Sequence, residues 1–245
     1  MVNSIQVRHW MNDYFRITKS GTYGFIMALP LLLGYEVLML LTPESERRIR
    51  ISAEVLLTMV LNSYVRWGFI VALMTIGITI FIKERDKGID IKPEYFSYML
   101  IESVFWVPVF ALTVGFLTRH SMLGAVLAAG GVGEMTVLGK LGISMGAGVY
   151  EEFVFRVLLV GFLCWAGTSL WPKQKRWVYI GSAVISALIF SAVHHLGALG
   201  DPFTFRVFVE RAIAGLILNI IYLSRGFGIA AWTHALYDMV VLLHQ

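Results

Sequence analysis

Cysteine is almost absent from this chain of 245 residues, which contains only Cys164. A single cysteine excludes an intrachain disulfide and any metal site built from several cysteines. Cys164 lies in an apolar run, where a cysteine usually packs as a small hydrophobic residue. The sequence also lacks internal repeats, low-complexity segments and linkers rich in proline or serine. Residues 1–245 are therefore interpreted as a single domain.

Charge is scarce as well. Charged residues make up 15% of the chain and hydrophobic residues 58%, and the mean hydropathy is +0.73. Soluble domains carry about a quarter charged residues. The apolar residues form runs near the roughly 20 residues that cross a bilayer core. The pattern predicts an all-α, polytopic membrane helix bundle. The net charge of +4 does not indicate a nucleic-acid partner, because the basic residues cluster at the ends of the apolar runs.

Seven membrane spans account for the apolar runs, and an eighth is left open. Two stretches are ambiguous: residues 51–66 form an interfacial helix or the start of span two, and residues 121–140 are predicted not to cross. The predicted spans are 21–41, one ending near 82, 96–117, 141–165, 177–194, 205–223 and 227–243.

Basic residues set the orientation of such a bundle. Arg8, Arg16 and Lys19 favour a cytoplasmic amino terminus, and seven spans then leave the carboxyl terminus outside. Arg47, Arg48 and Arg50 would lie outside and count against this topology. Residues 1–19 mix these cations with aromatic and aliphatic residues, which is typical of an amphipathic helix on a membrane surface.

Charged side chains inside a bilayer are costly, so they are usually paired and often functional. Span four contains Glu151, Glu152 and Arg156 within an apolar run. Glu152 and Arg156 are four residues apart on one helix face, which permits an ion pair. Adjacent helical positions are about 100° apart, so Glu151 points elsewhere and can act on water. Two close carboxylates suit a general base and a general acid.

Two further polar sets lie on later spans. Phe190 and His194 share a helix face at the end of span five, and His234 and Asp238 share a face in span seven. An aspartate can orient an imidazole, and either group can act on a reacting oxygen. A transporter using a proton relay is an alternative, but no inverted repeat is visible.

Together, Glu-Glu-x-x-x-Arg at 151–156, Phe-x-x-x-His at 190–194 and His-x-x-x-Asp at 234–238 resemble the CPBP or Abi family of CAAX prenyl proteases and bacteriocin-processing proteins. The likeness covers residues 140–242, and the catalytic helices would be 141–243. It implies an intramembrane endopeptidase of glutamate type, in the cytoplasmic membrane of a bacterium, that cuts a membrane-associated peptide or protein.

The resemblance also implies a role for each matching residue. Glu151 would activate water, Glu152 is the second motif glutamate, Arg156 is its ion-pair partner, and His194 would help hold the water. His234 and Asp238 would stabilise the oxyanion. CAAX-cleaving members have asparagine where this chain has Asp238. The resemblance therefore does not predict that this chain cleaves prenylated CAAX peptides.

Two alternatives remain. No cofactor is expected, but glutamate and two histidines from separate helices could hold zinc with an open position for water. The same polar pocket could also serve binding alone, in a non-catalytic membrane scaffold or a bacteriocin-immunity-type protein.

Overall fold

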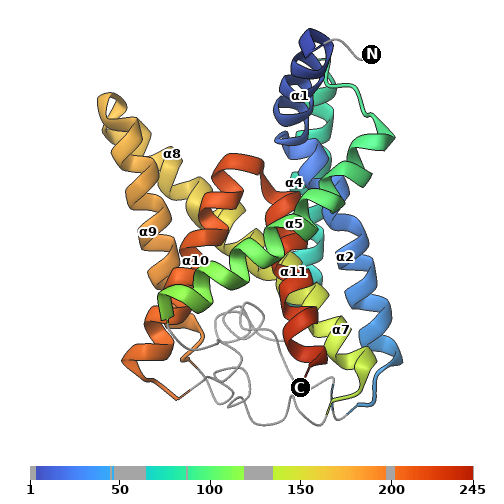
Figure 1. The fold of residues 1–245 in the computed structure, drawn as a ribbon, viewed down its shortest axis with the longest axis vertical. Helices are drawn as coiled ribbons and strands as arrows, with labels where there is room; N and C mark the ends of the chain where they lie inside the picture. Colours follow the sequence, from blue (N-terminus) through green and yellow to red (C-terminus); the bar gives the residue numbers. More distant parts are fainter. Residues whose placement is uncertain are drawn as a thin grey trace.

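The structure is a computed structural model that describes residues 4–44, 46, 65–86, 88–118, 135–196 and 202–244. Within these ranges the regular elements are all helical, and none is a strand (Figure 1). In chain order the helices are α1 (Ser4–Thr18), α2 (Gly21–Leu41), α4 (Val65–Arg85), α5 (Pro93–Thr118), α7 (Val137–Gly146), η2 (Ala147–Glu151), η3 (Phe153–Val160), α8 (Gly161–Leu170), η4 (Pro172–Gln174), α9 (Lys175–Val193), α10 (Phe205–Arg225) and α11 (Phe227–Leu243).

Six described helical segments are long and apolar enough to cross a membrane: Gly21–Leu41, Trp67–Arg85, Pro93–Val114, Val137–Leu170, Pro172–Val193 and Phe205–Arg225. The shorter apolar helix Phe227–Leu243 follows them. These segments coincide with the seven spans predicted from the sequence. The polytopic, all-α bundle is confirmed.

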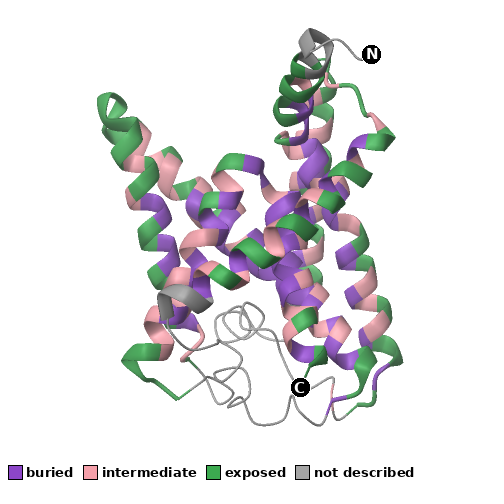
Figure 2. Cartoon of the chain, viewed as in Figure 1, coloured by how far each residue is buried: buried purple, intermediate pink, exposed green. Residues whose placement is uncertain are grey.

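The distribution of buried and exposed residues is that expected for a protein surrounded by lipid. The outward faces carry large apolar side chains such as Phe105 and Leu112, which are 70% and 72% exposed, whereas Glu152 and Arg156 are completely buried. Figure 2 shows buried residues along the inner faces of the packed helices and exposed ones on the outside. Apolar surface facing outward and charge facing inward is the arrangement of an integral, multi-pass membrane protein.

Several sequence predictions fall partly outside the described residues. Residues 1–3, 51–64 and 121–134 are not described, so neither the nature of 51–66 nor the crossing of 121–140 is decided. Residues 4–18 do form a helix, and Val137 begins α7 four residues before the predicted start of span four.

The helical geometry of span four differs from the prediction. The sequence predicts a regular α-helix over 141–165, but η2 and η3 are π-helical. A π-helix hydrogen-bonds from i to i+5, so its turns are wider than those of an α-helix, and it occurs often at functional sites. The 100° spacing that separated Glu151 from Glu152 therefore does not apply here.

A glycine lets this π-helical part approach α11. A Cβ at Gly148 would stand 2.6 Å from the carbonyl oxygen of Ala231 and 2.7 Å from the Cβ of Ala235. Real Cβ atoms do not come so close, so the two helices can pack at this distance only with glycine at 148. The close approach brings His234, on the same part of α11, toward span four.

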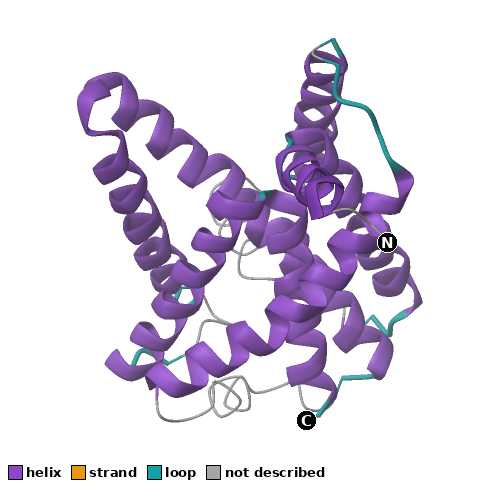
Figure 3. Ribbon diagram, turned by 45° about the horizontal axis from the view of Figure 1, so that its top comes forward, coloured by secondary structure: helices purple, strands orange, loops and turns teal. Residues whose placement is uncertain are grey.

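Helices α8 and α9 form a hairpin that extends away from the amino-terminal helices (Figures 1 and 3). The turn between them is η4, which Pro172 begins. We call residues 171–177 the hairpin tip. They comprise two exposed tryptophans, Trp171 and Trp177, around three exposed cations, Lys173, Lys175 and Arg176.

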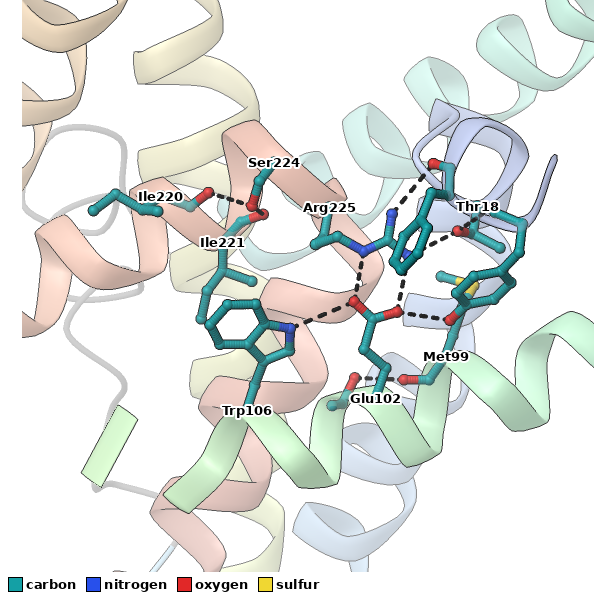
Figure 4. Close-up of polar contacts among 11 residues, drawn as sticks. Thr18, Met99, Glu102, Trp106, Ile220, Ile221, Ser224 and Arg225 are labelled. Carbon is teal, nitrogen blue, oxygen red and sulfur yellow. Dashed lines mark hydrogen bonds and ion pairs between the residues drawn. The ribbon is translucent and has the colours of Figure 1, made fainter. Parts of the chain in front are cut away.

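An ion pair fixes α1 to the bundle (Figure 4). Arg225, the last residue of α10, donates to Glu102 of α5 through Nε at 2.5 Å and through Nη2 at 2.8 Å. Nη2 also donates to the hydroxyl of Thr18, and the Tyr14 hydroxyl donates to Glu102 at 2.7 Å. Bidentate, charge-assisted contacts of this kind are among the stronger hydrogen bonds. They join α1 to α5 and to the turn that leads into α11.

Candidate active site

The two adjacent glutamates lie at the junction of the π-helical segments. Glu151 ends η2, and Glu152 separates η2 from η3. Glu151 is 4% exposed and Glu152 is completely buried. A buried carboxylate is costly unless charged or hydrogen-bonding groups compensate it. The neighbours of each glutamate therefore determine what it can do.

Glu152 is neutralised from two sides. Arg156 Nη1 lies 2.9 Å from Glu152 Oε1, so the predicted ion pair is confirmed. His234 Nδ1 lies 2.7 Å from the same oxygen. Arg156 is held in place by a hydrogen bond from Nη2 to the Gly215 carbonyl oxygen at 3.3 Å, and its guanidinium lies over the Phe190 ring. Glu152 is thus the centre of a buried charge network.

Glu151 faces imidazole rings at longer distances. Its Oε2 lies 3.8 Å from His194 Nε2 and 4.0 Å from His234 Nε2. Both distances exceed a direct hydrogen bond, and at such separations a bridging water is the natural intermediary. A water therefore has space between Glu151 and the two imidazoles, whereas His234 contacts Glu152 directly.

His194 presents a defined ring nitrogen to Glu151. It is the C-cap of α9, and its Nδ1 lies 2.8 Å from the carbonyl oxygen of Phe190. A carbonyl oxygen only accepts, so Nδ1 carries the proton. In a neutral imidazole, Nε2 then has the lone pair. The Phe-x-x-x-His spacing accounts for this contact, because residues four apart meet on one helix face.

His234 stands among three carboxylates. Besides its contact with Glu152, its Nε2 lies 3.4 Å from Asp238 Oδ2 and 4.0 Å from Glu151 Oε2. An imidazolium donates from both ring nitrogens, which suits acceptors on both sides. The structure thus brings all six predicted site residues together from spans four, five and seven.

Glutamate and two histidines from separate helices are also the kinds of donor that a zinc site uses. Among the residues that the structure describes, no group of three or more His, Cys, Asp or Glu side chains is arranged to hold a metal ion.

Sequence reasoning missed some contacts around the site. Ser186 of α9 donates to the Phe155 carbonyl oxygen in η3 at 2.9 Å, and Tyr150 donates to Glu36 of α2 at 3.1 Å. A buried serine among apolar residues gives no signal of its partner. Near the start of α10, Glu210 forms an ion pair with Arg206 at 2.9 Å.

Comparison with known proteins adds one finding. Residues 133–240 match the family model described as type II CAAX prenyl endopeptidase, Rce1-like. This segment contains all six site residues. Neither the curated proteins nor the solved structures include a match to the chain.

Proposed function

We propose that this integral membrane protein, whose residues 133–240 match the family model of the Rce1-like type II CAAX prenyl endopeptidases, is an endopeptidase in which Glu151 activates water. The observation that carries the proposal is the position of Glu151, buried in a membrane span with His194 and His234 within 4.0 Å. The substrate would be a membrane-associated peptide or protein, and the host membrane the cytoplasmic membrane of a bacterium.

The attacking water would be held by Glu151 and His194. A carboxylate oxygen and the lone pair of His194 Nε2 are both acceptors, whereas water has two O–H donors. A water donating to both would present its own lone pair to the scissile carbonyl carbon. Glu151 would accept a proton as the new C–O bond forms, which is general-base catalysis.

The next step needs groups that stabilise negative charge on the former carbonyl oxygen. His234 supports this role, because an imidazolium can donate from Nε2 while Nδ1 donates to Glu152. Collapse of the tetrahedral intermediate breaks the C–N bond, and Glu151 returns its proton to the departing amine. One peptide bond and one water yield a carboxylate and an amine, with no covalent enzyme intermediate.

Asp238 separates this chain from CAAX-cleaving members that carry asparagine. An ionised aspartate cannot donate a hydrogen bond to an oxyanion. We propose that Asp238 Oδ2, which lies 3.4 Å from His234 Nε2, orients the ring before the substrate binds, and that the oxyanion then replaces it as the acceptor from Nε2. A prenylated CAAX peptide is therefore not assumed as the substrate.

The proposal predicts that Glu151→Gln abolishes cleavage and leaves the fold intact. Membrane-protein fragments would be compared in cells that produce wild-type protein or this variant at equal levels. Glu210→Gln is the matched control: Glu210 is 3% exposed and pairs with Arg206, outside the Glu151 cluster. Fragments absent from Glu151→Gln cells and present in control cells would identify substrates. Identical patterns in all three would refute hydrolysis by Glu151 and favour a binding role.

Metal dependence is tested separately. We expect purified protein to keep its activity after prolonged chelation and dialysis, since Glu151 and the two imidazoles would act on water directly. Lasting loss of activity that zinc restores, and magnesium does not, would contradict the metal-free mechanism.

A further inference from the structure

A cavity of about 340 Å³ lies beside η3, the helix that follows Glu151 and Glu152. Its walls come from the α1–α2 junction, α4, η3, α9, α10 and the start of α11. The lining is mostly apolar and includes Leu73, Ile76, Ile80, Phe153 and Val157. The helices that form it are candidate membrane spans, so hydrocarbon is the medium around it. Apolar walls bind hydrocarbon and offer water few hydrogen-bond partners.

The size of the cavity limits what can occupy it. The volume is near the lower limit of small-molecule pockets, which suits a single extended chain.

One end of the cavity is polar. Lys19 and Ser20 line it there, and Lys19 is exposed. The nearby Glu84 carboxylate is engaged with the backbone, because it accepts from the N–H groups of Gly21 and Thr22. Lys19 is thus the group at this end that can meet an anion from outside.

The hairpin tip places this end at the level of lipid headgroups. Exposed tryptophans mark the membrane–water interface, and the tip carries Trp171 and Trp177 around three cations. Tyr179, which lines the cavity, is two residues beyond Trp177 along α9. The cavity therefore begins at headgroup level and continues into the apolar layer, with positive charge on the hairpin as well as at Lys19.

We propose that this cavity binds an anionic phospholipid, with one acyl chain along Leu73, Ile76 and Val157 and the phosphate near Lys19. Charge complementarity favours an anionic lipid over a zwitterionic one, because Lys19 in the lining and the three cations of the hairpin tip attract net negative charge. Phe153 and Val157 in the wall follow Glu152 and Arg156 in sequence. The acyl chain would therefore pack directly against η3.

Native mass spectrometry of the purified full-length protein tests this binding without reference to proteolysis. The protein is titrated with phosphatidylglycerol or phosphatidylcholine of identical acyl chains, and bound lipid is counted. We expect phosphatidylglycerol to bind more tightly. Lys19→Ala should weaken its binding about fivefold. Lys83→Ala, which removes an exposed lysine from the same end of the molecule but outside the cavity, should leave it within twofold.

A second pair of variants tests the place of the acyl chain. Ile76→Trp should reduce lipid binding at least tenfold by filling the cavity. Ile78→Trp, on the same helix but 47% exposed and not part of the lining, should have little effect. Equal affinities for the two lipids, equal effects within either pair of variants, or displacement by millimolar inorganic phosphate would overturn the proposal. If Ile76→Trp does not fold, the lysine pair still decides. Loss of lipid binding with cleavage retained would separate this proposal from the proposed function.

Discussion

Replacing Ser186 by alanine should damage catalysis far more than stability, because its hydroxyl joins two helices that carry different parts of the site. Ser186 lies on α9, and Phe190 and His194 follow it at intervals of four on the same face. Its Oγ donates at 2.9 Å to the Phe155 carbonyl oxygen in η3, one π-helical turn from Glu151. The hydroxyl is completely buried. It therefore fixes the position of α9 relative to the glutamates.

The chain provides a closely matched control in Ser103. Ser103 is also completely buried and also donates at 2.9 Å, but to the Met99 carbonyl oxygen within its own helix. Each alanine removes one hydroxyl and one hydrogen bond, so each should cost about 1 kcal/mol of stability. Only Ser186→Ala allows the Glu151–His194 separation to change, and a misplacement of about 1 Å can cost on the order of 100-fold in rate.

The assay is steady-state cleavage of a substrate identified through Glu151→Gln, alongside thermal unfolding of both variants in detergent. We expect similar midpoints, an unchanged KM, and a kcat lowered about 10- to 100-fold in Ser186→Ala alone. Ser186→Thr, which keeps the hydroxyl, should recover part of the rate. Equal kcat values for Ser103→Ala and Ser186→Ala would refute the reasoning, because the bond between helices would then have no role in positioning.

Two further predictions concern other polar contacts. Asp238→Asn should keep kcat within about tenfold of the wild-type value, because the amide oxygen of asparagine can still accept from His234. Asp238→Ala should lower kcat about 100-fold or more. Equal losses in the two variants would contradict the orienting role of Asp238. Glu102→Ala should remove the carboxylate that pairs with Arg225 and accepts from Tyr14, and so loosen α1 at a cost of about 3 kcal/mol. Trypsin should then cleave within α1 faster than in wild-type protein and in the exposed control Glu94→Ala, and unchanged cleavage would contradict the anchoring role.

The sequence alone predicted the apolar helices well and singled out polar residues that lie together in the structure, for a physical reason. In a membrane protein an apolar run of sufficient length has few alternatives to a helix, and a charge within it is costly, so Glu151, Glu152, His234 and Asp238 stand out. The predicted boundaries of the spans were close to the observed ones for the same reason.

Contacts between distant segments could not be predicted. Arg225 and Glu102 are 123 residues apart in sequence. Taken alone, Arg225 resembles a cation at a helix end, and Glu102 resembles an isolated acid within a membrane span. The π-helical geometry of η2 and η3 has no residue signature in this chain, so the assumption of 100° per residue was wrong there. The contact of His234 with Glu152 joins residues 82 apart in sequence, so the sequence pattern paired His234 only with Asp238, four residues away.

This geometry distinguishes the two glutamates and supports Glu151 as the general base. Glu152 has Arg156 and His234 within 2.9 Å, so its negative charge is compensated and taking up a proton would break both contacts. Glu151 has imidazole nitrogens at 3.8 and 4.0 Å, distances at which a water can lie between. A base must gain and then lose a proton in each cycle, and the contacts of Glu152 with Arg156 and His234 make that exchange costly at Glu152. The same argument disfavours a proton relay through both carboxylates, because transfer through Glu152 would disrupt the buried charge network that holds His234 in place.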